Sequence, residues 1–191
     1  RLGELHEADV PDEGRAIAAL GAWAEADPTD DEPLRRLVPK LEATRRHPRL
    51  TEVLDALAGL ELDDAAASDH VRRAAAIAHR QLGDVEGAWR RLAPRVRGGD
   101  EAAEADLCAL AESTGAGERL AELYVALAQG SEDAETQRRR WMDAARVYEA
   151  TLEQPERALE AVLRALAVDL SERRFLDEAD RGGIAWAPGV D

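Results

Sequence analysis

The six residues RLTEVL at positions 49–54 recur as RLAELY at positions 119–124. The match extends beyond this hexapeptide. AAAI at 74–77 aligns with AARV at 144–147, and Leu82 aligns with Leu152. The chain therefore repeats itself with a period of about 70 residues. A fixed period of this kind indicates stacked copies of one structural unit, each hiding its apolar faces against its neighbours.

Composition supports a folded, helical protein with an acidic surface. The 191 residues carry 25 basic and 40 acidic side chains, a net charge of −15, and 45% are hydrophobic while only 4% are aromatic. This is too much apolar material for a disordered acidic tail. An evenly negative surface repels phosphate backbones and anionic lipid, so the sequence predicts no nucleic-acid partner and no membrane insertion.

Helix-capping residues and helix-stopping Gly or Pro divide each period into four helices, or two hairpins. Within the helices, apolar residues follow the i, i+3, i+4, i+7 spacing of a buried helical face, as at Val71, Ala74, Ala75 and Ala78. Ile77 adds a second apolar strip, so the helix needs two neighbours. The predicted helices are 12–26, 29–46, 48–60, 64–82, 84–98, 100–115, 117–128, 133–152, 155–168 and 171–180, preceded by an N-terminal helix that is part of an incomplete repeat.

The segment LGDVEGA at 82–88 resembles the turn of the tetratricopeptide family, in which a Gly-Asp pair separates two antiparallel helices. Ala16 followed by Pro28 is similar to the family's closing proline, and PERA at 155–158 repeats the pattern, although Leu170 stands where the next closing proline belongs. The resemblance implies an all-α fold, a right-handed α-α superhelix of about five hairpins, similar to long bacterial arrays of which this chain could be a fragment. It places the repeat domain at residues 1–181 and an irregular tail at 182–191.

In that family the first helix of each hairpin lines a concave groove that binds a protein or peptide. Carried over by position, the resemblance implies a groove rich in arginine, which suits an acidic segment or a terminal carboxylate. The alternative is that these arginines are solvated and paired with nearby acids. The partner-binding residues expected on this basis are His70, Arg73, Arg80, Gln81, Glu112, Arg140 and Asp143.

The residues give no sign of catalysis, a cofactor or a metal site. Cys108 is the single thiol, and its place in the repeat predicts a buried, inert side chain. Asp63, Asp64, Asp69 and His70 lack a glycine-centred calcium loop, and acids gather at helix starts for electrostatic reasons. The stretch STGAG at 113–117 lacks the lysine of a phosphate-binding loop and is expected to be a turn.

Two smaller groups are assigned structural roles. Ser131 and Ser171 stand where helix N-caps are needed. The four tryptophans are expected to pack inside the fold, and they are Trp23, Trp89, Trp141 and Trp186.

The sequence thus predicts a non-enzymatic scaffold or adaptor that binds a partner protein or peptide. A regulatory sensor domain that binds a small ligand remains the alternative. Self-association through the open N-terminal repeat, and a tail at 184–188 that caps the last helices, are further expectations. Lack of a signal peptide suggests a cytoplasmic location, but a chain that begins at Arg1 leaves an earlier targeting segment open.

Overall fold

The computed structural model describes the backbone of residues 2–181 and the side chains of residues 13–170. The chain divides into two compact units, residues 1–110 and 111–191. The described part contains helices and no strand, which confirms the all-α class. The helices are α1 (Leu2–Ala26), α2 (Glu32–Ala43), α3 (His47–Leu60), α4 (Asp64–Leu82), α5 (Val85–Arg97), α6 (Glu101–Thr114), α7 (Gly117–Gly130), α8 (Ala134–Ala150) and α9 (Pro155–Arg181).

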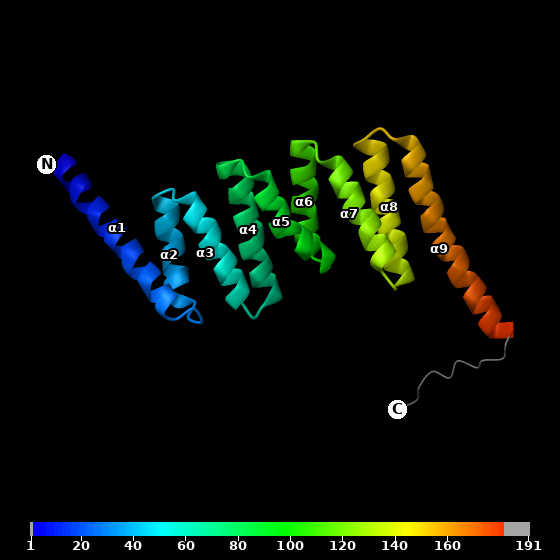
Figure 1. The fold of residues 1–191 in the computed structure, drawn as a ribbon, viewed down its shortest axis with the longest axis horizontal. Coiled ribbons are helices and arrows are strands. Elements are labelled where there is room, and N and C mark those ends of the chain that lie inside the picture. The colour runs from blue at the N-terminus through cyan, green and yellow to red at the C-terminus, as the bar shows by residue number, and fades with distance from the viewer. Residues whose placement is uncertain (1, 182–191) are drawn as a thin grey trace, which may run out of the picture. The chain divides into compact units, whose positions relative to one another are not determined.

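Neighbouring helices pack against one another within each unit. In the first unit α1 packs on α2, α2 on α3, α3 on α4 and α4 on α5; in the second, α7 packs on α8 and α8 on α9. Successive helices within a unit run in alternating directions (Figure 1). A helix flanked on both sides needs two apolar strips, which is the pattern that the sequence shows.

Aspartate caps and glycine stops set most of the helix boundaries at the predicted places. Asp84 caps α5 by accepting a hydrogen bond from the Gly87 amide at 2.8 Å, and Asp133 caps α8 through the Thr136 amide at 2.8 Å. Gly83 ends α4 in the left-handed conformation at φ 66°, which a side chain would make costly. The cap of α4 is Asp63 rather than the predicted Asp64.

Two predicted helix breaks are wrong. A start at Asp12 was expected, but α1 runs through that position. An aspartate by itself does not stop a helix, and a proline can bend a helix without ending it. A turn between residues 168 and 171 was also expected, but α9 is continuous. The reason lies in Leu170, which replaces the closing proline and leaves this stretch without a Gly or Pro to stop a helix.

Three predicted capping roles are also wrong. Thr29 was expected to begin a helix, but its hydroxyl donates to Asp27 at 2.7 Å in a local turn and α2 begins only at Glu32. Ser131 follows the end of α7, while Asp133 caps the next helix. Ser171 lies inside the uninterrupted α9.

The core of the first unit is built from leucine and valine of α2 and α3, with Ile17 and Ala74 from the helices on either side. Leu41 and Leu54 are fully buried. In the second unit small residues bring the helices close together, as where Ala144 of α8 and Ala161 of α9 are buried. Alanine therefore makes up much of the interface between α8 and α9.

The tryptophans divide between core and surface. Trp89 and Trp141 are buried, as predicted, whereas Trp23 is 40% exposed. The guanidinium of Arg36 lies 5.9 Å from the centre of the Trp23 ring and covers part of it, so this ring is a surface cation–π partner rather than core. Trp186 and the tail at 184–188 lie outside the described residues.

Arginine–carboxylate pairs join helices that are two apart in the chain. The Arg91 guanidinium donates to Asp55 at 2.6 Å, and that of Arg72 to Asp106 at 2.6 Å. The same kind of pair joins α2 to α4 and α7 to α9, and the residues involved are Arg73 with Glu42 and Arg157 with Glu118. Of the arginines expected in a groove, Arg73 is thus held by a nearby acid, as in the alternative that the sequence left open.

Candidate functional site

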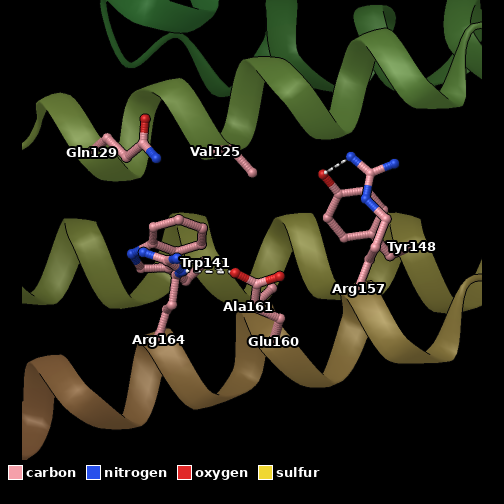
Figure 2. Close-up of a pocket in the computed structure, with 8 residues that line it drawn as sticks. All are labelled: Val125, Gln129, Trp141, Tyr148, Arg157, Glu160, Ala161 and Arg164. Atoms are coloured by element: carbon pink, nitrogen blue, oxygen red, sulfur yellow. Dashed lines mark hydrogen bonds and ion pairs between the residues drawn. The ribbon is translucent and has the colours of Figure 1, made fainter.

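The second unit contains a small cleft whose walls come from three successive helices. Val125 and Gln129 on α7 form one side, and Arg157 and Arg164 on α9 form the other (Figure 2). Between them α8 supplies the rings of two aromatic residues. The cavity volume is about 150 Å³, well below the roughly 300 Å³ at which small-molecule sites begin. The cleft has room for one side chain or one carboxylate.

Arg157 lies against the first ring. Its guanidinium carbon is 4.3 Å from the centre of the Tyr148 ring, and Nη2 donates to the Tyr148 hydroxyl at 2.9 Å. Nη1 donates to the amide oxygen of Gln154 at 2.9 Å and also bonds Glu118 on α7. The bond to Glu118 raises the pKa of Arg157 above its ordinary value. Arg157 is thus fixed in place and permanently cationic.

Arg164 lies against the second ring but is less constrained. Its guanidinium carbon is 5.4 Å from the centre of the Trp141 ring, and Nη2 donates to Glu160 at 3.0 Å. Both members of this ion pair are more than half exposed, so water competes for the interaction and the pair stabilises the fold little. A guanidinium has five N–H donors, and Glu160 accepts one hydrogen bond from Nε and one from Nη2 of Arg164. An incoming carboxylate can therefore bind Arg164 in place of Glu160.

The sequence positions of these residues mirror one another about the turn between α8 and α9. Tyr148 and Arg157 are equally far from the middle of the turn, and so are Trp141 and Arg164. In an antiparallel hairpin, positions equidistant from the turn lie side by side, and residues seven apart fall on one helix face. This spacing can be read from the sequence. It predicts contact between each arginine and its ring only when α8 and α9 are known to pack side by side.

The site residues expected from the family resemblance fall in both units. In the first unit Arg73 is ion-paired with Glu42 on α2, while Arg80 and Gln81 are exposed in the last turn of α4. His70 is half-buried on the same helix. These four side chains share α4, and Arg73 joins this helix to α2 through its ion pair with Glu42.

In the second unit, Arg140 and Asp143 form their contacts within the unit. Arg140 is only 3% exposed, pairs with Asp143 at 3.3 Å and lies 5.5 Å from the centre of the Tyr124 ring. Glu112 is exposed on α6. The cleft is lined instead by Trp141, the next residue along the chain, and by arginines of α9 that sequence reasoning did not select.

A second cavity, of about 350 Å³, lies in the first unit where α4, α5 and α6 meet. Its charged walls are already paired: Arg95 donates to Asp64 at 2.8 Å and to Asp100 at 3.2 Å, and the Ser68 hydroxyl also donates to Asp100. A ligand here would have to break these interactions. We therefore assign this cavity a structural role.

Asp100 gives a pH-dependent test of that role. Burial raises its pKa, but the hydrogen bonds from Ser68, the Ala103 amide and Arg95 together lower it below the ordinary value. A lowered folded-state pKa stabilises the fold above the unfolded-state pKa of about 4, and the stabilisation is lost as the pH falls through the folded-state pKa. We expect Asp100→Ala to lower the free energy of unfolding by about 2 kcal/mol at pH 7, and by less at pH 3.

Urea denaturation at the two pH values measures this difference. Glu101→Gln, a change at the exposed neighbouring position, is the control and should have little effect at either pH. An Asp100→Ala deficit that is the same at pH 3 and pH 7 would show that the charge of Asp100 does not stabilise the fold.

The remaining candidates for chemistry have ordinary explanations. Residues 115–116 form the turn from α6 to α7, and the rest of the stretch lies in these two helices. A Cβ on Gly117 would lie 2.9 Å from a side-chain methyl carbon of Thr151, so this position is closely packed. Cys108 is half-buried rather than buried as predicted, because its position on α6 leaves part of the side chain at the surface. Among residues with described side chains, no three metal-binding groups come together.

None of the described helices combines the length and apolar character needed to span a membrane. No family model, no curated protein and no solved structure matches the chain.

Proposed function

We propose that this chain is a non-enzymatic interaction module, built as a right-handed α-α superhelix of about five tetratricopeptide-like hairpins, which binds an acidic segment of a partner protein. The repeat in the sequence and the packing of each helix on its neighbours support this architecture. The observation that carries the binding role is the cleft of the second unit, where two arginines are held against aromatic rings.

The chemistry of the cleft favours a carboxylate. Arginine stacked on an aromatic ring presents its planar edge outward, where a carboxylate can accept two parallel hydrogen bonds. Arg157 is fixed by Tyr148 and Gln154 before any ligand arrives, so little side-chain entropy is lost on binding. A Glu or Asp side chain, or a C-terminal carboxylate, fits the volume of the cleft.

Peptide binding tests the proposal. The probe is a fluorescein-labelled peptide of alternating Glu and Leu with a free C-terminal carboxylate, followed by fluorescence anisotropy. We expect Arg164→Ala to weaken binding about tenfold, the effect of losing one charge-assisted hydrogen-bonding partner. Binding should also weaken as salt is raised, since the contact is between exposed charges.

Matched controls identify the site and the ligand group. Arg146→Ala removes an arginine that is 72% exposed on α8 and outside the cleft, and it should leave binding unchanged. A peptide with Gln in place of Glu reports on side-chain carboxylates, and one with an amidated C-terminus reports on the terminal carboxylate. Equal binding of all three peptides, or an unchanged affinity of Arg164→Ala, would refute the proposal.

A further inference from the structure

The outer face of α9 carries four exposed leucines in a row. Leu159, Leu163, Leu166 and Leu170 are between 50% and 64% exposed. The opposite face of α9 is buried, through Ala158, Ala161 and Ala165, and α9 packs on α8. The leucines therefore form a continuous apolar strip that nothing in the described part of the second unit covers.

The same positions are covered elsewhere in this chain. One period earlier, α5 carries Trp89, Ala93 and Val96 in place of the first three leucines, and those residues are at most 5% exposed. The face that α9 exposes is therefore one that the repeat normally buries. A helix is the natural cover for it, because the repeat contains nothing but helices in its described part.

The spacing of the four leucines indicates which helix covers the strip. They follow one another at steps of four, three and four residues, the alternation of the d and a positions in a coiled-coil seam. We infer that α9 pairs with α9 of a second copy of this chain, antiparallel, about a twofold axis that passes between residues 164 and 165. In that arrangement Leu163 packs on Leu166 of the second copy, and Leu159 packs on Leu170 of the second copy.

The charges beside the strip fit this arrangement. Glu160 and Asp169 border the leucines, one on each side. About the proposed axis Glu160 lies opposite Ala167 of the second copy, and Asp169 lies opposite Val162 of the second copy. No acid faces an acid, so a twofold pairing avoids the like-charge repulsion that would otherwise oppose it.

The area of the strip predicts a weak dimer. Each leucine offers on the order of 100 Å² of apolar surface, so four leucines with their flanking side chains bury about 400 Å² per chain, half of the roughly 800 Å² per partner of a standard interface. An interface of this size is typical of weak, transient complexes, so we expect a dissociation constant of roughly micromolar to millimolar. Since each copy carries a net charge of −15, raising the salt should strengthen the dimer.

Analytical ultracentrifugation over a range of protein concentration tests the inference. We expect a concentration-dependent species of twice the 20.8 kDa monomer, and we expect Leu163→Glu with Leu166→Glu to weaken it at least about 100-fold, since the seam would bury unpaired charges. Leu62→Glu is the control, because Leu62 is a fully exposed leucine outside α9. Circular dichroism should show that both variants remain helical.

Disulfide trapping tests the direction of pairing. In a Cys108→Ala background, a mixture of Leu163→Cys and Leu166→Cys chains should oxidise to the mixed dimer faster than either chain alone. Faster homodimer formation would indicate a parallel pair and overturn the proposed geometry. A wild-type chain that stays monomeric at 1 mM, or a dimer that survives both glutamates, would overturn the site itself, including the case in which residues 182–191 cover the strip.

Discussion

Replacing Leu54 by Ala is expected to lower the free energy of unfolding of the first unit by about 3–4 kcal/mol. Leu54 lies on α3 and is fully buried, at the centre of a cluster that includes Leu37 and Leu41 of α2 and Ala74 of α4. Truncation removes buried methyl groups and leaves a cavity that three separate helices would have to close. Because these helices are also held by their other contacts, the site can relax only in part.

Urea denaturation followed by circular dichroism measures this loss, and hydrogen exchange shows whether the amides of α2, α3 and α4 lose protection together. Leu62→Ala is the matched control, since Leu62 is fully exposed just beyond the end of α3 and its truncation should change stability by less than about 0.5 kcal/mol. A loss below about 1 kcal/mol at Leu54 would mean that the cluster does not stabilise the unit.

Replacing Arg140 by Ala is expected to cost about 3 kcal/mol in the second unit. The Arg140 side chain is buried against the Tyr124 ring and pairs with Asp143, which is itself largely buried. Removing the arginine takes one charged partner away from the Asp143 carboxylate, which also pairs with the mostly exposed Arg146. The cost of a buried charge without its partner exceeds the value of the pair itself.

A double-mutant cycle separates these two effects. If the loss of this partner of a buried carboxylate is the cause, Arg140→Ala with Asp143→Ala will be more stable than Arg140→Ala alone. Arg139→Ala changes the neighbouring exposed arginine and should have little effect. Equal losses at positions 139 and 140 would show that burial of Arg140 has no energetic consequence.

The sequence was most informative where one residue sets a local conformation. Asp84, Asp133 and Gly83 marked helix ends correctly because each satisfies or interrupts backbone hydrogen bonds within a few residues of itself. Some errors arose where the family pattern was followed without such a residue. The expected break near residue 170 is one example, since Leu170 offers no reason for a helix to stop.

The candidate site was less accessible from sequence because it depends on helix pairing. Arg157 and Arg164 meet their aromatic partners only when α9 is rotated to face α8, and the pattern of one helix does not fix its rotation against another. Arg140 illustrates the opposite error. Its charge suggested a surface role, whereas the alanine-rich packing of α8 and a nearby acid allow it to be buried.

The ion pairs between alternate helices bear on how such a chain can grow by duplication. The two residues of each pair stand between 31 and 39 positions apart, about the length of one hairpin. A gene segment that encodes two hairpins, the repeat that the sequence shows, can carry both members of such a pair, so a new copy brings its own ion pairs with it.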